Sequence, residues 1–373
     1  MKGTSPSRAS GGEAARHLSA KMVFDASINN LEGESMKIMT VGIDLAKNVF
    51  AVHGIDEHGK AALVRPSVRR EQLLELVATL APCVIGMEAC SGAHHWARAF
   101  AALGHTPKLM APKFVAPYRM AGRRGKNDAA DAAAICEAVQ RPNMRFVPIK
   151  NVDQQGTLCI HRVRQGFVEE RTATINRIRG LLSEFGIVLP KKADTVRRKA
   201  AAALEELPGW ANRAIGDLLS HLWALDVRIT EYDAHIKQLA QADARSVRLM
   251  QMPGIGPITA SALLAAIGNG HDFKGGRQLA AWLGLVPGQY GTGGNVRLGY
   301  ITKAGDPYLR TLLILGARSV LASANNKTDR LSRWALSVYE RRGYGKALVA
   351  IAAKNARMAW ALLAKGKAFA PLT

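Results

Sequence analysis

The sequence predicts a mixed α/β domain followed by a mainly helical chain, and three observations support this prediction. Between residues 36 and 146, short apolar runs alternate with segments of helical spacing, a pattern typical of a sheet with helices packed on it. Residues 154–187 and 212–245 are long, mixed-charge stretches with apolar residues three and four apart. This spacing predicts two antiparallel helices, interpreted as a coiled coil. After residue 250, glycines punctuate helical segments that are rich in small residues.

The first part of the chain divides into a tail and an α/β segment. Residues 1–35 are rich in Ser, Gly, Ala and Asn without periodicity, so we expect a disordered extension. Apolar runs between turn residues predict strands, and helical spacing or high alanine content predicts helices. The expected strands cover 38–43, 48–54, 61–65, 83–89 and 106–110, and the expected helices cover 71–80, 93–103 and 126–140.

The remainder of the chain is predicted to be helical around one glycine-rich loop. Between the two long helices, PKKADTVRRKAAA is expected to form a basic tip. A turn opens a helix within 252–268, a short helix covers 278–285, and a loop covers 287–307 before further helices. The predicted division is a 1–35 extension, a 36–146 α/β domain, a 147–246 helical region and a 247–373 C-terminal domain.

The charge balance indicates a polyanionic partner. The chain has 51 Lys and Arg against 29 Asp and Glu, a formal net charge of +22. Residues 247–373 contribute +13 of this, from 17 basic and 4 acidic residues. An excess of this size favours nucleic acid and argues against an ordinary small-metabolite enzyme. The C-terminal third is therefore the predicted phosphate-facing surface, the alternative being a basic tail kept soluble by its charge.

The cysteines and the apolar runs indicate a cytoplasmic protein. Cys83, Cys90, Cys136 and Cys159 form no CxxC pair and no His-flanked cluster, so neither a zinc site nor a disulfide framework is expected. No apolar run of about 18 residues is evident, so no membrane span is expected. The N-terminus has no apolar segment of the kind found in a signal peptide.

Four carboxylates follow the pattern of a metal site. Asp44 and Glu88 each end an apolar run, and Asp128 and Asp131 are three apart in the alanine-rich helix. Four acidic groups gathered at strand ends and on one helix face would repel one another without a cation. Carboxylate oxygens suit Mg²⁺, and two such ions can position a nucleophile and stabilise the leaving oxygen of a phosphodiester.

Each carboxylate also has an ordinary structural interpretation. In that interpretation Asp44 is a turn or cap residue, Glu88 is a solvated loop carboxylate, and Asp128 with Asp131 begins a helix. An actin-like ATPase also places an acid after its first strand, but it needs a second α/β half with phosphate loops. Residues 150–245 are helical in pattern instead, so the metal site is the favoured interpretation.

Several ordered motifs resemble one known family. GIDLAKNVFAV, IGMEACSG and KNDAADA precede PGIGPITASALLAAIG and GLVPGQYGTGGNVRLGYITKAGDPYLRTLLILGAR. Together they resemble the Asp-Glu-Asp-Asp insertion-sequence transposases, which are related to the pilin-gene invertase and include the bridge-RNA-guided recombinases. The resemblance covers residues 36 to about 367.

The resemblance implies a fold and a composite site. It implies a ribonuclease H-like domain, similar to the Holliday-junction resolvases, then a helical coiled-coil insertion and a mainly α-helical C-terminal transposase domain. Asp44, Glu88, Asp128 and Asp131 match the family's four metal-binding acids. Family members use a serine nucleophile in the glycine-rich loop and assemble as oligomers, so that one subunit's acids act with another's serine.

The serine position falls on Thr292 in this sequence, within Tyr290-Gly291-Thr292-Gly293-Gly294. A threonine hydroxyl can act as a nucleophile once its proton is removed, although its methyl group restricts χ1 and crowds the approach. We interpret Thr292 as a working substitute, the alternatives being weakened activity or a plain loop residue. Tyr290 and Thr302 are weaker candidates.

Glycines and basic residues around these motifs are the candidate nucleic-acid contacts. Gly254 and Gly256 lie in a helix-hairpin-helix-like turn whose backbone N–H groups can approach a phosphate, or they form a tight helix–helix turn without a ligand. The basic candidates are Arg123, Arg124 and Lys126, which precede Asp128, and Arg297, Lys303 and Arg310, which flank Thr292. Solvated surface charge is the alternative for each of them.

The sequence therefore predicts a DNA recombinase of an insertion sequence. Its expected cofactor is Mg²⁺, and its expected partners are element-end and target DNA, further copies of the chain and, by resemblance, a structured guide RNA. A cytoplasmic, nucleoid-associated bacterial protein is expected. The alternatives are a hydrolytic resolvase-like nuclease and a non-catalytic, nucleic-acid-binding relic of a transposase.

Overall fold

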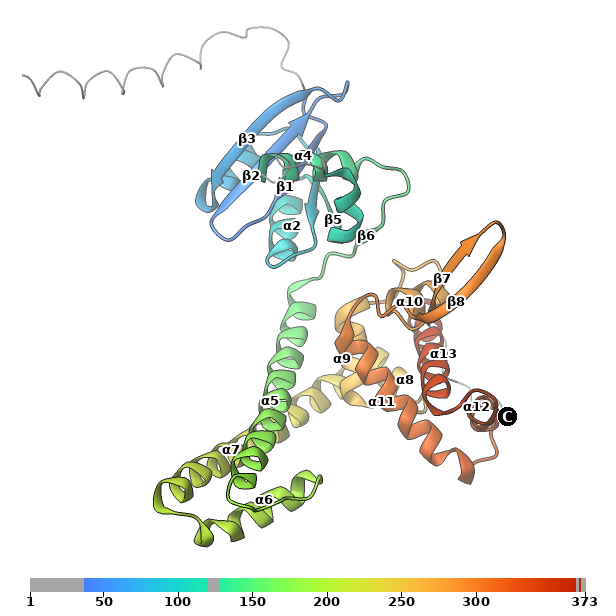
Figure 1. The fold of residues 1–373 in the computed structure, drawn as a ribbon. Helices are drawn as coiled ribbons and strands as arrows, with labels where there is room; N and C mark the ends of the chain where they lie inside the picture. The colour runs from blue at the N-terminus through green and yellow to red at the C-terminus, as the bar shows by residue number, and fades with distance from the viewer. Residues whose placement is uncertain (1–36, 120–127, 367–368, 370–373) are drawn as a thin grey trace, which may run out of the picture. The chain divides into compact units, whose positions relative to one another are not determined.

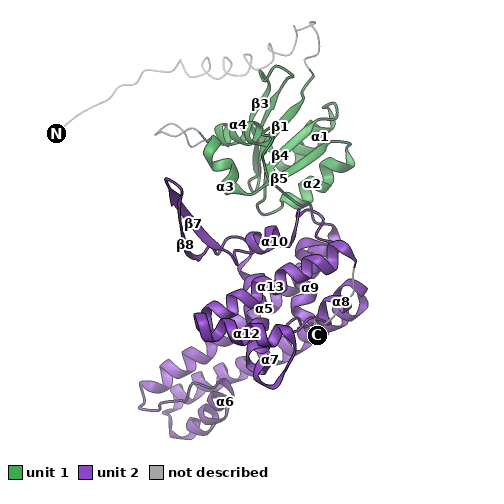
Figure 2. Ribbon diagram, turned by 90° about the vertical axis from the view of Figure 1, so that its right-hand side faces the viewer, with its two compact units in different colours: residues 1–147 green, residues 148–373 purple. Residues whose placement is uncertain are grey.

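A computed structural model describes residues 37–119, 128–366 and 369 of the chain. The chain forms two compact units, and the boundary between them along the sequence lies between Val147 and Pro148 (Figure 2). The first unit contains a mixed sheet with helices, and the second is mostly helical (Figure 1). The predicted α/β segment and helical remainder are therefore confirmed. The finer division at 246/247 stays a prediction, since both of its sides lie within the second unit.

The first unit is built on a six-stranded sheet in the order β3-β2-β1-β4-β5-β6. β1, β2 and β3 are joined as an antiparallel meander, β4 and β5 continue parallel to β1, and β6 is antiparallel at the edge. The strands are β1 (Thr40–Asp44), β2 (Val49–Ile55), β3 (Ala61–Arg69), β4 (Val84–Glu88), β5 (Thr106–Met110) and β6 (Phe146–Val147). All five predicted strands are present, and β6 is additional.

Helices pack against this sheet because its central strands are apolar and buried. α1 (Leu73–Ala78) and α2 (Ala93–Ala102) share one core with inward side chains of β1 and β4, including Ile43 and Met87. α3 (Pro112–Val115), the 3₁₀ turn η2 (Ala116–Tyr118) and α4 (Asp128–Val139) form a second cluster around Ile135. A short 3₁₀ turn η1 (Arg70–Gln72) precedes α1.

Two glycines let α4 lie directly on the sheet. Gly42 in β1 and Gly86 in β4 are register partners across the parallel pair. A Cβ at Gly42 would lie 2.2 Å from the Ala132 carbonyl oxygen, and one at Gly86 would lie 2.8 Å from the Val139 Cβ. Since strand side chains alternate between faces, these glycines clear the α4 side while their apolar neighbours fill the other. The start of α4 is thereby held close to the ends of β1 and β4.

The second unit begins with two long helices that lie side by side (Figure 1). α5 (Val152–Ser183) starts with a capping box between Asn151 and Gln154, and α7 (Gly209–Ala242) returns along it. Ion pairs link the helices and the segment between them, such as Arg197 to Asp226 at 2.6 Å. The predicted basic tip is largely helix α6 (Ala193–Ala202), followed by the 3₁₀ turn η3 (Ala203–Glu206).

The rest of the second unit is a helical cluster with one shared core. Its helices are α8 (Ala244–Met250), α9 (Pro257–Ile267), α10 (Gly276–Trp282), α11 (Pro307–Ser323), α12 (Arg330–Arg342) and α13 (Tyr344–Lys365), with η4 (Ala324–Asn326) after α11. α13 is long and apolar enough to span a membrane by length and composition, which the sequence analysis did not anticipate. Half of that apolar stretch is buried, and Ala352 and Ala359 are fully buried in the shared core.

The expected loop at 287–307 is wrong over most of its length, because residues 287–301 form a β-hairpin. β7 (Pro287–Thr292) pairs antiparallel with β8 (Asn295–Ile301). Gly293 and Gly294 connect them with positive φ angles of 57° and 83°, the conformation that a two-residue hairpin turn needs. The many glycines suggested a loop, whereas the alternation of Val296, Leu298 and Tyr300 was the strand signal.

Candidate active site

The four predicted carboxylates lie together at one edge of the first unit's sheet. Asp44 ends β1 and Glu88 ends the neighbouring parallel strand β4, so both occupy the carboxyl ends of the central strands. Asp128 and Asp131 occupy the first turn of α4, which Gly42 and Gly86 hold against those strands. Asp128 is exposed, whereas Asp44, Glu88 and Asp131 are half-buried.

The charges of these groups act on one another. Burial first, and then the charges of Asp131, Asp128 and Glu88, raise the pKa of Asp44 to about 6, against a smaller opposing effect of Arg119. The pKa of Glu88 is also raised, mainly by burial. The positive charge of Arg119 opposes this increase, and the negative charge of Asp131 adds to it. Carboxylates resist ionisation where like charges share a site. This is the electrostatic environment in which a divalent cation would be stabilising.

Arg119 joins two of the carboxylates and was not predicted from sequence. Its guanidinium donates to Glu88 Oε1 at 2.8 Å and forms an ion pair with Asp131 Oδ1 at 3.0 Å. The two acids expose only 13% and 17% of their side chains, whereas Arg119 exposes 38%. A lone arginine after a short turn carries no periodic signal, so only the fold connects it with Glu88 and Asp131.

The oxygens of the four carboxylates suit a hard divalent ion, but the side chains would have to rearrange to bind one. All four groups offer carboxylate oxygens, the ligands that Mg²⁺ prefers. Within the part of the chain that the structure describes, no three His, Cys, Asp or Glu side chains form a cluster that could hold a metal. Arg119 contacts the two carboxylates that a shared ion would contact. Asp44, Glu88, Asp128 and Asp131 are the groups that would hold such an ion.

Thr292 lies at the tip of the hairpin in the second unit. It is exposed at the end of β7, directly before Gly293, and pairs in register with Asn295. Tyr290 and Arg297 are also register partners, so both pairs share one face of the ribbon. Val296, Leu298 and Tyr300 alternate onto the opposite face, where their exposed fractions are 63%, 65% and 95%. The hairpin thus has a polar face with Thr292 and an apolar face.

The other predicted nucleic-acid contacts fall into different settings. Arg297 and Lys303 are exposed, and Lys303 has a positive φ of 51°. Arg310 is half-buried and donates to the carbonyls of Leu283 at 3.1 Å and Ala304 at 3.0 Å, so its observed contacts support the loop. Arg123, Arg124 and Lys126 lie outside the described residues.

The two glycines of the helix-hairpin-helix-like turn also differ. Gly254 has a φ of 80°, and a Cβ there would lie 2.6 Å from the Gly316 carbonyl oxygen in α11. This close approach explains Gly254 by helix packing alone. Gly256 is exposed in open space before Pro257, at the N-terminus of α9, where backbone N–H groups favour an anion.

A buried histidine of the second unit was not predicted from the sequence. His161 of α5 lies 3.0 Å from Tyr308 Oη and 3.0 Å from Ser261 Oγ, so it connects α5 with α11 and α9. Burial first, and then Arg164, lower the pKa of His161 to about 4. Its partners are 147 and 100 residues away in sequence, so no local pattern indicates this network.

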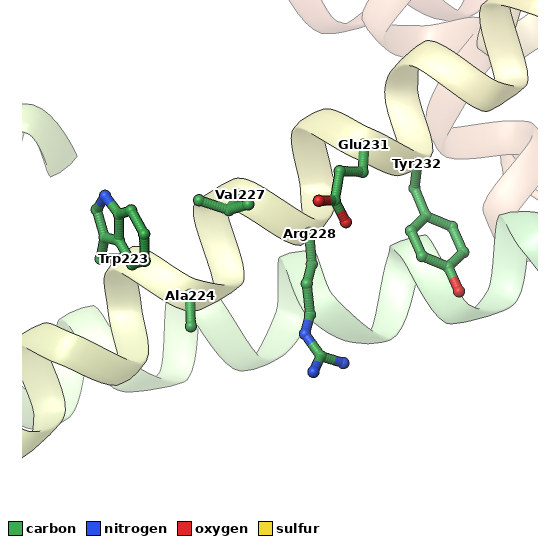
Figure 3. Close-up of a pocket in the computed structure, with 6 residues that line it drawn as sticks. All are labelled: Trp223, Ala224, Val227, Arg228, Glu231 and Tyr232. Carbon is green, nitrogen blue, oxygen red and sulfur yellow. The ribbon is translucent and has the colours of Figure 1, made fainter.

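The helix α7 carries an open groove on its surface. Trp223, Ala224, Val227, Arg228, Glu231 and Tyr232 line a volume of about 360 Å³ (Figure 3). Trp223 is 71% exposed. An exposed aromatic residue beside apolar and charged neighbours is typical of a protein contact surface.

Comparison with known proteins identifies the family. A model of DEDD transposases of the IS110 type matches residues 41–187, and the model of the transposase IS116/IS110/IS902 family matches residues 246–333. The first match includes all four carboxylates, and the second includes Thr292 and the hairpin.

Named transposases resemble the chain over nearly its whole length. A probable family 20 transposase of Pseudomonas aeruginosa is 46% identical over 90% of this chain and 100% of its own. The transposase for insertion sequence element IS1111A of Coxiella burnetii is 41% identical, covering 92% and 94% of the two chains. That for IS1328 of Yersinia enterocolitica is 39% identical, covering 89% and 98%. The chain thus belongs to the IS116/IS110/IS902 family of transposases and is a DNA-recombining enzyme of an insertion sequence.

Proposed function

We propose that the chain excises or inserts its element by Mg²⁺-dependent cleavage and exchange of DNA strands, with Thr292 as the covalent nucleophile. The observation that carries this is that Asp44 and Glu88 end neighbouring parallel strands, while Arg119 links Glu88 to Asp131 of α4. The mixed sheet with acids at the ends of its central strands supports a ribonuclease H-like domain. When bound, the ion would neutralise charge that develops on the phosphoryl group.

The chain's own groups have distinct roles in this proposal. The four carboxylates would hold the ion, whose positive charge would attract the scissile phosphodiester. The Thr292 Oγ1 forms a bond to phosphorus while the bond from phosphorus to one deoxyribose oxygen breaks. The hydroxyl proton passes to solvent, and the leaving deoxyribose oxygen takes up a proton. The exposed hairpin tip supports this role, because Thr292 is exposed to solvent and the two turn glycines have open space beside them.

DNA is the partner that the family and the net charge support, and we propose Arg297, Lys303 and Gly256 as phosphate contacts. We further propose a homo-oligomer, supported by the exposed Trp223 and Val227 on α7. Arg123, Arg124 and Lys126 remain predicted contacts of DNA or RNA, and a structured guide RNA remains a prediction from the resemblance. Four free cysteines support a reducing compartment, so we propose action in the bacterial cytoplasm at the nucleoid.

Covalent trapping tests the nucleophile. The full-length protein is incubated with element-end DNA, target DNA, Mg²⁺ and the RNA that flanks the element, and protein–DNA adducts are resolved on denaturing gels. Thr292→Ala is expected to abolish the adduct, whereas Thr292→Ser is expected to retain it. Thr328→Ala is the matched control, since Thr328 is an exposed threonine of the same unit. Cleavage without any adduct would indicate hydrolysis by water and would refute the covalent step.

A further inference from the structure

Arg119 is the cation that already joins the candidate metal ligands. Its guanidinium contacts Glu88 Oε1 at 2.8 Å and Asp131 Oδ1 at 3.0 Å, so one planar group links the end of β4 to the first turn of α4. Charge-assisted contacts of this kind are stronger than neutral hydrogen bonds. Both acids are mostly covered, so this positive charge offsets repulsion that water alone would screen poorly.

Arg119 directly follows packed residues of η2, while its own side chain is partly exposed. Tyr118 of η2 packs against the cluster that contains Val115 of α3 and Ile135 of α4. The Arg119 side chain is 38% exposed, more than twice the fraction of either acid. The guanidinium can therefore rotate into solvent without moving the core, whereas Glu88 and Asp131 stay on packed elements.

We infer that Arg119 is an exchangeable internal counter-ion, which holds Glu88 and Asp131 together and competes with the divalent ion for the same oxygens. This inference rests on the proposed metal site. A carboxylate oxygen that accepts from a guanidinium is less available to a metal, so one cation leaves as the other binds. The exchange keeps the two acids neutralised in both states, and it makes metal binding weaker than the four carboxylates alone would allow.

Metal titration of the full-length protein tests this competition. Mn²⁺ binding is measured by electron paramagnetic resonance of the free ion for the wild type, R119Q, R119K and R65Q. R65Q is the matched control, because Arg65 is an exposed arginine of the same unit that donates to the Val64 carbonyl. The dissociation constant is expected to fall about tenfold in R119Q, because the ion no longer has to displace a charge-assisted contact. R119K should be intermediate, since an ammonium lacks the planar fork, and R65Q should resemble the wild type.

Thermal unfolding is a second measurement, and it distinguishes a competing arginine from one with a purely structural role. R119Q should unfold at a lower temperature than the wild type in EDTA, and Mn²⁺ should raise its unfolding temperature by more than it raises that of the wild type. Equal or weaker Mn²⁺ binding by R119Q would overturn the competition while leaving the metal site intact. A wild type that binds no Mn²⁺ would overturn the metal site and, with it, the role of Arg119.

Discussion

In the first unit, burial and neighbouring carboxylates raise the pKa of Asp44 to about 6, whereas in the second unit burial lowers the pKa of His161 to about 4. Burial favours the neutral form in both cases. The difference lies in the surroundings. Asp44 is half-buried among like charges at the edge of a sheet, whereas His161 is fully buried between two hydroxyl groups.

This contrast separates a binding site from a structural network. The His161 ring finds both of its partners within the fold, so its neutral form is satisfied and needs no ligand. Among the described residues, Arg119 is the one cation that pairs with Glu88 and Asp131, so the four carboxylates retain affinity for a further cation. A group of carboxylates whose pKa values are raised by burial and by one another is typical of a functional site. The following predictions test this contrast, from the largest expected change in stability to the smallest.

Gly42→Ala tests whether close packing of α4 positions the carboxylates. A Cβ at this position would lie 2.2 Å from the Ala132 carbonyl oxygen and 2.4 Å from the Cys136 backbone nitrogen. Backbone atoms cannot move aside without shifting α4, so we expect a loss of about 3 kcal/mol in the free energy of unfolding. Denaturant unfolding measures it, and Mn²⁺ binding should weaken as well.

Gly180→Ala is the control for this substitution. Gly180 lies within α5, and a Cβ there would meet nothing within 4 Å. The alanine should leave stability unchanged or raise it by up to about 1 kcal/mol, because alanine favours helix. Normal stability and metal binding in Gly42→Ala would contradict the packing argument.

His161→Leu tests whether the histidine network is structural. The substitution removes the ring that lies 3.0 Å from Tyr308 Oη and from Ser261 Oγ. The half-buried hydroxyl of Tyr308 loses a partner, so we expect unfolding to require about 2 kcal/mol less. His271→Leu is the matched control, because His271 is an exposed histidine of the same unit, and its effect should stay within about 0.5 kcal/mol. An unchanged stability in His161→Leu would remove the structural role.

Asp44→Asn should stabilise the metal-free protein while abolishing its activity. At pH 7 the wild-type carboxylate is ionised among like charges, and the amide removes this repulsion. The gain should be roughly 1 kcal/mol after discounting for solvent screening, measured by thermal unfolding in EDTA. Asp56→Asn is the control, since Asp56 Oδ1 already accepts from the His58 and Lys60 backbone, and it should give no gain. Recombination that survives in Asp44→Asn would contradict the metal site.

The stabilities of the two units should change with pH in opposite directions between about pH 4 and 6. The folded first unit holds a proton on Asp44 more tightly than the unfolded chain does, so this contribution to stability falls as pH rises toward 6. The folded second unit holds a proton on His161 less tightly, so its stability falls as pH drops below 6.5. Hydrogen exchange of α4 and α9, corrected for intrinsic rates, measures the stability of each unit as a function of pH. Stabilities that change in the same direction with pH would contradict this prediction.

The sequence predicted the parts of the site that follow local patterns. Apolar runs that end in Asp44 and Glu88 predicted β1 and β4, because a buried strand and its terminal acid are neighbours in the chain. Asp128 and Asp131 were predicted on one helix by their spacing. Arg119 and His161 were missed, since their partners are brought close only by folding. The hairpin was missed because glycines that serve its turn and ribbon resemble the glycines of a loop.

The hairpin β7–β8 also bears on how the protein behaves in concentrated solution. Within the described residues it is a sheet of only two strands, so both outer edges present backbone N–H and C=O groups without a neighbouring strand. Such edges, next to the exposed Val296, Leu298 and Tyr300, are templates for edge-to-edge aggregation. The net charge of +22 would keep chains apart at low ionic strength. High salt removes this repulsion, so purified protein should precipitate as salt is raised.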